Sequence, residues 1–106
     1  MKVLSEGHRY ELENFEVGGS IKQTIQFIEK MPSPHPTFEG EMETIHNDTT
    51  NEDVLAMLIN RIQYLQGKFP CRENAIVITK LEESLMWLNK RTADRLKRNV
   101  EGKHLS

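Results

Sequence analysis

Several features that commonly organise a small protein are scarce in this chain of 106 residues. It contains one cysteine, Cys71, which excludes an internal disulfide framework and suits a reducing compartment, so we expect a cytosolic protein. The longest unbroken aliphatic run, residues 75–78, is far too short to cross a bilayer, and no charged segment followed by an apolar run opens the sequence. We therefore expect one domain over residues 1–106 and no membrane function.

The residue groupings that typify metal and catalytic centres are also missing. Glu82 and Glu83 suggest an acidic Mg²⁺-binding helix, but Met86 and Trp87 stand where a second acidic pair would be needed. Cys71 has no sequence-local base that would make it a nucleophile. The histidines lack helical i, i+4 pairing and cysteine neighbours, which disfavours metal ligation: His8, His35, His46 and His104. We expect no catalytic residue, no metal and no cofactor, hence a protein that is not an enzyme.

The whole chain has no large excess of acidic or basic residues, but the two kinds are unevenly distributed along it. The net charge is −2, whereas residues 1–53 carry 4 basic and 11 acidic side chains and residues 54–106 carry 10 and 5, which makes the halves −7 and +5. A general binder of polymeric nucleic acid needs a basic surface throughout, while a site for a small phosphorylated ligand needs only two or three arginines or lysines. The charge distribution favours the small ligand.

Glycine and proline are absent from residues 71–100, which predicts one long helix there. Pro70 stands before this stretch and Gly102 after it, and basic residues crowd its last turns, which is the expected order of helix start, stop and dipole signals. Apolar residues recur at spacings of 3, 4 and 3 and define one buried stripe: Ile78, Leu81, Leu85 and Leu88. The helix is expected to pack along this stripe.

The length of that helix predicts self-association. About 27 residues at ~1.5 Å rise span roughly 40 Å, whereas a domain of ~100 residues has a radius of gyration of about 13 Å. Arg72, Thr79 and Met86 recur every seven residues on a second stripe, offset from the first. One protomer cannot cover such a helix, so we expect association through the helices.

The rest of the chain predicts a second helix and a small sheet, so the fold class is α+β. Thr49 or Thr50 can cap a helix over residues 49–66, and Gly67 offers a left-handed stop before a short connection, which predicts an antiparallel helical hairpin. Strands are expected at residues 9–16 and 20–29, joined at Gly18 and Gly19, with the second ending near Met31 before the prolines. A weaker alternation at residues 38–44 completes a β region over residues 9–45. The apolar face of the first helix comprises Leu55, Leu58, Ile59, Ile62 and Leu65.

Basic and aromatic residues on the two helices are the candidates for binding. Arg91, Arg95 and Arg98 follow at i, i+4 and i+7, so their guanidinium groups share one face and can converge on two phosphates, although the same spacing also fits a solvated helix end. Tyr64 can offer a flat ring to a nucleobase or belong to the core. Asn74, in the first turn of the long helix, is either a local cap or a ligand contact.

Several blocks of this sequence resemble a known phage family. The blocks FPCRENAIVITKLEESLMWLNKRTADR, TTNEDVLAMLINRIQYLQ and YELENFE are similar to the Tad family of Thoeris anti-defence sponges, whose helical hairpin is shared with the anti-CBASS cyclic-nucleotide sponges. The similarity extends from about residue 10 to residue 104 and leaves out residues 31–48. It implies a protein that acts in the host bacterial cytoplasm, captures cyclic ADP-ribose isomers (gcADPR) made by TIR-domain immune proteins, and does not cleave them.

The resemblance also implies particular residues and an assembly. The signal-binding residues of the family match Tyr64, where the family has phenylalanine stacking on adenine, Asn74 on the nucleoside, and Arg91 and Arg95 on the phosphates. A weaker second site, for CBASS cyclic di- or trinucleotides, would use Arg72 and Thr79 near a three-fold axis. The implied assembly is a homo-oligomer, either a dimer or a hexamer built as a trimer of dimers. An adaptor protein that only assembles through its helices is the alternative, and it gives Tyr64, Arg91 and Arg95 no reason to converge.

Overall fold

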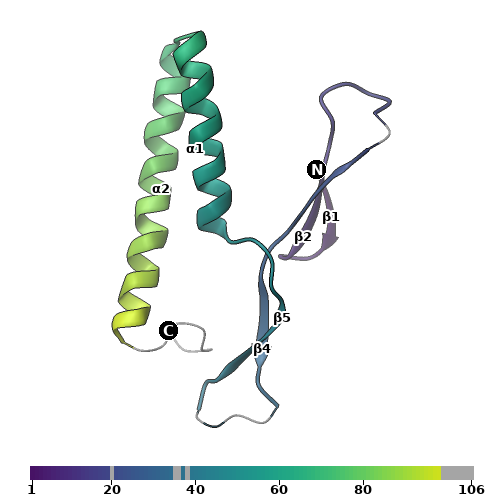
Figure 1. The fold of residues 1–106 in the computed structure, drawn as a ribbon, viewed down its shortest axis with the longest axis vertical. Helices are drawn as coiled ribbons and strands as arrows, with labels where there is room; N and C mark the ends of the chain where they lie inside the picture. Colours follow the sequence, from purple (N-terminus) through teal and green to yellow (C-terminus); the bar gives the residue numbers. More distant parts are fainter. Residues whose placement is uncertain (20, 35–36, 38, 99–106) are drawn as a thin grey trace. The chain divides into compact units, whose positions relative to one another are not determined.

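The chain has antiparallel strands followed by two helices, which confirms the α+β class with a C-terminal helical hairpin (Figure 1). The computed structural model describes residues 1–19, 21–34, 37 and 39–98. It divides into two compact units, Met1–Thr50 and Asn51–Ser106, which are described separately. The expectation that residues 1–106 form a single domain stays a prediction.

The N-terminal unit contains two small antiparallel sheets. One sheet has the strand order β1-β2-β3 and the other pairs β4 with β5. The prediction of strands from residue 9 onward missed β1, because its residues KVLS do not alternate and all four are exposed. The strands are β1 (Lys2–Ser5), β2 (Arg9–Leu12), β3 (Gln23–Gln26), β4 (Glu29–Pro32) and β5 (Met42–His46).

Strands β2 and β3 pair as the alternation predicts, but a loop of ten residues joins them in place of a tight turn. Tyr10 lies opposite Ile25, and its ring meets that of Phe27 edge to face at 6.0 Å between centroids. In the loop, only Gly18 of the two predicted turn glycines has a positive φ, at 97°. Gly19 lies against Asn14, so a Cβ at residue 19 would require the side chain of Asn14 to move.

That asparagine closes the loop. Its Nδ2 donates to the carbonyl oxygen of Ile21 at 2.7 Å, and Ile21 lies outside β3 and is 74% exposed, although the strand predicted over residues 20–29 includes it. A side-chain hydrogen bond of this kind competes with strand pairing and ends the ladder early. The predicted strand over residues 9–16 therefore stops at Leu12.

The single strand predicted over residues 20–29 is interrupted, and its continuation becomes β4. The backbone N–H of Phe27 donates to the carbonyl of His8, and that of Ile28 donates to Thr49, so the chain changes pairing partner between β3 and β4. Strand β4 ends at Pro32, which lacks the N–H needed to continue a ladder. Strand β5 overlaps the alternation expected at residues 38–44, of which residue 38 lies outside the described residues.

The C-terminal unit is a hairpin of α1 (Asn51–Lys68) and α2 (Arg72–Lys97). The prediction that Gly67 stops α1 in a left-handed conformation is wrong, because Gly67 lies inside the helix and is not among the positive-φ glycines. The helix continues until Phe69 N bonds to Leu65 O at 2.8 Å, and Pro70 follows, where the ring disfavours a helical conformation at the preceding residue. Helix α2 ends at Lys97 with Arg98 as its C-cap, and the predicted last residue, 100, lies outside the described residues.

The predicted stripe of α2 is the least exposed part of that helix. Its partly buried residues follow the spacing 4, 3, 4, 3, 4, 3 of a two-helix seam: Asn74, Ile78, Leu81, Leu85, Leu88, Thr92 and Arg95. On α1, Ile59 is buried and Leu55, Ile62 and Leu65 are partly buried, while Leu58, expected on the same face, is 39% exposed. The seam is apolar in its middle and polar at both ends.

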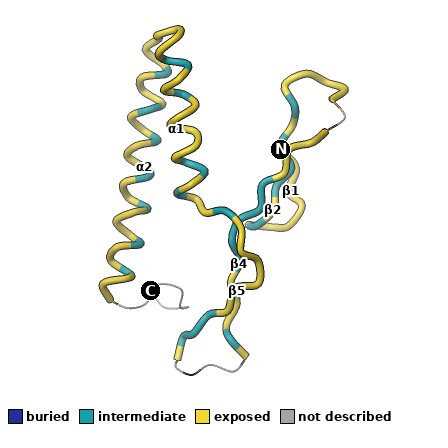
Figure 2. Tube along the Cα trace, viewed as in Figure 1, coloured by how far each residue is buried: buried dark blue, intermediate teal, exposed yellow. Residues whose placement is uncertain are grey.

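The hairpin hides little of its apolar surface. Among the described residues only Ile59 is classed as a buried hydrophobic side chain, with 9% of its surface exposed (Figure 2). Large apolar side chains remain exposed on both helices: Met57, Leu58, Ile76, Val77, Met86, Trp87 and Leu96. Two helices have only one contact surface between them, so a stable structure favours further partners for the remaining faces.

Truncation at the centre of the seam is expected to weaken the hairpin. Ile59→Ala should lower the free energy of unfolding by about 2 kcal/mol or more, because it removes buried methylenes and leaves a cavity against Leu85. Met57→Ala, on the same helix but 54% exposed, should change it by about 0.5 kcal/mol or less. Urea titration followed by circular dichroism measures both, and equal losses would contradict the proposed seam.

Candidate functional site

The connection between the helices positions Asn74, one of the predicted binding residues. Cys71 is the N-cap of α2, with extended backbone dihedrals of −149° and 158°, and its Sγ accepts the backbone N–H of Asn74 at 3.4 Å. Its own N–H donates to Gln66 Oε1 at 3.0 Å, which ties the connection to the end of α1. The capping contact therefore uses the backbone of Asn74, while Cys71, an exposed thiol, supplies the cap.

Tyr64 projects from the last turns of α1 and does not belong to the hairpin core. Its side chain is 55% exposed, and Lys68 Nζ lies 5.0 Å from the ring centroid, a cation–π distance. Of the two interpretations open from the sequence, the core interpretation is therefore wrong for a single chain. The ring presents a flat apolar surface with a positive charge beside it.

The arginines at the other end of α2 fall on two neighbouring stripes. Arg91 and Arg98 are exposed and line one shallow hollow of about 280 Å³, together with Trp87, Lys90 and Asp94. Arg95 does not line this hollow and is partly buried. Adjacent turns of one helix thus carry the two arginines predicted to bind phosphate, and the two differ in exposure.

The predicted set of four residues does not meet within one chain. Asn74 and Arg91 are 17 residues apart on one continuous helix, which corresponds to about 25 Å. Tyr64 lies near the connected end of the hairpin, while Arg91 and Arg95 lie near the opposite end of α2 (Figure 1). A nucleotide-sized ligand cannot reach both groups of residues in a single hairpin.

The residues expected to form a second site do lie together. Arg72 and Thr79 line one hollow of about 310 Å³ on the first turns of α2, with Ala75, Ile76 and Lys80. Thr79 Oγ1 donates to the carbonyl of Ala75 at 3.2 Å, so its proton is used within the helix while its lone pairs still accept. Arg72 and Lys80 give the hollow a positive charge.

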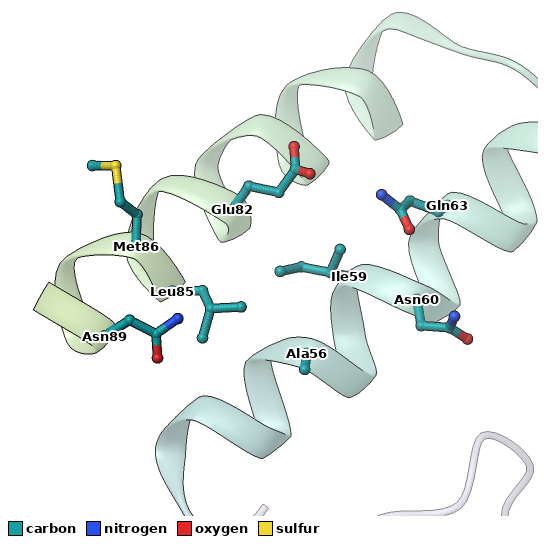
Figure 3. Close-up of a pocket in the computed structure, with 8 residues that line it drawn as sticks. All are labelled: Ala56, Ile59, Asn60, Gln63, Glu82, Leu85, Met86 and Asn89. Atoms are coloured by element: carbon teal, nitrogen blue, oxygen red, sulfur yellow. The ribbon is translucent and has the colours of Figure 1, made fainter. Parts of the chain in front are cut away.

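A groove between the two helices was not predicted from the sequence. Figure 3 shows Ile59 and Leu85 lying between the helices, with amide side chains above and below them. The groove has a volume of about 590 Å³ and is lined by Ala56, Ile59, Asn60, Gln63, Glu82, Leu85, Met86 and Asn89. Its lining contains one carboxylate and no basic side chain, so it suits neutral polar groups and disfavours phosphate. The signal in the sequence was the pair of amides at Asn60 and Gln63, flanking the apolar stripe of α1.

Within residues 1–19, 21–34, 37 and 39–98, no three His, Cys, Asp or Glu side chains gather as a metal-binding group. Over the same ranges, neither helix combines the length and the apolar character that crossing a membrane demands.

Fold and site together define an α+β protein whose helical hairpin carries a tyrosine and an asparagine at one end and clustered arginines at the other. The family model described as the Acb2/Tad1 hairpin domain matches residues 33–93, which is more than half of the chain, and the chain belongs to this family. It is 51% identical over 89 residues to Thoeris anti-defense 1 of Bacillus phage SBSphiJ7, a match that covers 82% of this chain and 63% of that protein. The chain thus spans somewhat less than two thirds of the curated relative it matches.

Proposed function

We propose that this protein is a phage anti-defence protein that binds and sequesters a cyclic ADP-ribose isomer (gcADPR) without cleaving it. The observation that carries the proposal is the 51% identity to a protein named Thoeris anti-defense 1, over most of this chain. Capture of the signal in the cytoplasm of the infected bacterium would deprive the downstream immune effector of its activator. The residues proposed to bind are Tyr64, Asn74, Arg91 and Arg95.

The separation of these residues within one chain supports a site shared between two copies. Two hairpins packed antiparallel would bring Tyr64 and Asn74 of one copy beside Arg91 and Arg95 of the other, on both sides of a two-fold axis. The exposed apolar side chains of both helices supply surface for such packing. We therefore propose a homo-oligomer, a dimer or a trimer of dimers, as the binding species.

Recovery of the ligand separates a sponge from an enzyme. The protein is incubated with gcADPR, filtered to show depletion of free ligand, and then denatured by heat, and the released ligand is analysed by mass spectrometry. A sponge releases intact gcADPR in proportion to protein, whereas an enzyme releases a product with a changed mass or retention. Failure to deplete the ligand at micromolar protein would instead favour the adaptor that assembles without a small-molecule ligand.

A second ligand class is favoured by the hollow that contains Arg72 and Thr79. Repeated around a three-fold axis of a hexamer, this basic hollow would present three arginines to a cyclic trinucleotide, whose three phosphates it would match in number and charge. Polymeric nucleic acid is not proposed as a partner, because the basic residues form local clusters.

The two proposed sites can be separated by one substitution. Arg72→Ala should weaken cyclic trinucleotide binding at least about tenfold, since it removes a charge-assisted contact from each copy, and should leave gcADPR binding unchanged. Calorimetry with each ligand in turn measures both. Loss of both ligands to the same extent would contradict two separate sites.

A further inference from the structure

The hollow at the C-terminal end of α2 contains an aromatic residue that the proposed binding set leaves out. Trp87 is the only tryptophan of the chain and is 57% exposed, although it stands among charged residues. Trp87, Arg91, Asp94 and Arg98 follow at spacings of 4, 3 and 4, so they lie along one stripe of α2. The indole is thus one turn from the guanidinium of Arg91.

The charges around this indole leave an excess of two positive units. The lining residues include three cations, Lys90, Arg91 and Arg98, and one anion, Asp94. Lys90 Nζ pairs with Asp94 Oδ2 at 2.7 Å, so the single carboxylate is directed to a lysine on the same helix. A doubly substituted pyrophosphate carries two negative charges at neutral pH, which matches this excess.

We propose that Trp87 is part of the ligand site, where its indole packs against the nucleoside that is attached to the phosphates held by Arg91. The inference rests on the proposed function and adds a residue to that site. Tryptophan offers the largest stacking surface among side chains, and arrangements that combine an aromatic face with neighbouring cations suit a base or sugar linked to phosphate. A helix end that is only solvated needs neither an exposed aromatic face nor cations beside it.

Burial of this hollow against the same hollow of a second copy is disfavoured. A two-fold contact between identical surfaces would place three cations opposite three cations, with one carboxylate on each side to offset them. A dianionic ligand removes this repulsion and covers the indole at the same time. Ligand binding would therefore explain why an apolar side chain is exposed at Trp87 in the single chain.

Because the chain has a single tryptophan, its emission reports on the proposed contact directly. The unaltered protein is titrated with gcADPR while tryptophan fluorescence is recorded, and the same titration is followed by calorimetry. We expect an emission change that saturates with the Kd obtained from heat. Trp87→Ala should weaken binding about tenfold or more, and Trp87→Phe should lose at most a few fold because a stacking ring remains. Glu83→Ala, one turn before Trp87 on the same helix and exposed, is the matched control and should bind normally.

Each outcome separates the inference from the function on which it rests. Calorimetric binding without any emission change, or Trp87→Ala that binds like the unaltered protein, would overturn the role of Trp87 and leave the sponge function standing. Absence of heat and of ligand depletion in the unaltered protein would overturn the proposed function. Size-exclusion chromatography accompanies each variant. Trp87→Ala could dissociate into single chains while ligand leaves the emission of the unaltered protein unchanged. These two results together would assign Trp87 to a subunit contact and reject the inference.

Discussion

The double variant Arg91→Ala, Arg95→Ala is expected to lose nearly all binding of gcADPR. Nanomolar affinity corresponds to about −12 kcal/mol, and each charge-assisted arginine contact contributes roughly 1.5 to 3 kcal/mol. Removal of two such contacts should therefore weaken binding by more than about a hundredfold. Isothermal titration calorimetry measures the change, and the residual affinity of each single variant should fall further as salt rises, because the remaining contact is electrostatic.

The two arginines need separate controls because they lie in different surroundings. Arg91 is exposed, whereas Arg95 is partly buried, so its removal can also lower the stability of the protein. Thermal melting and the oligomeric state of each variant must match those of the unaltered protein before affinities are compared. Lys97→Ala removes an exposed cation from the same helix end and should bind normally. Unchanged affinity in the double variant would mean that the basic face is a solvated helix end.

Mixing two variants that each bind gcADPR weakly is expected to restore binding, if the site lies between antiparallel copies. Tyr64→Ala removes the stacking ring, and should weaken binding by about one to two orders of magnitude. In a mixed pair formed with the Arg91→Ala, Arg95→Ala protein, one site has all four proposed residues intact and the other retains only Asn74. Calorimetry on the refolded mixture should recover near-normal affinity with half the usual stoichiometry in each mixed pair.

The controls for complementation follow from the same geometry. Either variant refolded alone should stay weak, and Tyr64→Phe should bind almost as tightly as the unaltered protein because its stacking face survives. Native mass spectrometry confirms that mixed assemblies form. A mixture that contains mixed assemblies but binds no better than its components would show that the site is not shared between copies.

The helical half of the fold could be read from the sequence because its signals are local and repeat along the chain. The stripe at Leu81, Leu85 and Leu88 recurs at helical spacing over about two turns, so its direction toward a partner helix does not depend on distant residues. The prediction that Gly67 ends α1 is wrong because a glycine after an apolar run stops a helix only where the backbone adopts a positive φ. In α1 the proline three residues later ends the helix instead.

The strands were less predictable because their ends depend on particular contacts. The hydrogen bond from Asn14 to Ile21 shortens the hairpin that alternation alone would extend, and the exposed strand β1 shows no alternation at all. The change of partners between Gln26 and Glu29 likewise requires residues of distant segments. Such pairings follow from tertiary contacts, and period-two patterns cannot report them.

The sequence by itself determined the family, the α+β class and the two clusters of candidate binding residues, because sequence motifs, helical spacing and charge are properties of the chain alone. Only the tertiary structure decided that Tyr64 is exposed, that Arg95 is partly buried while Arg91 is exposed, and that Arg95 stays out of the hollow lined by Arg91 and Arg98. These facts depend on which face of each helix is covered. Spacing gives the faces of a helix, but packing selects the one that is covered.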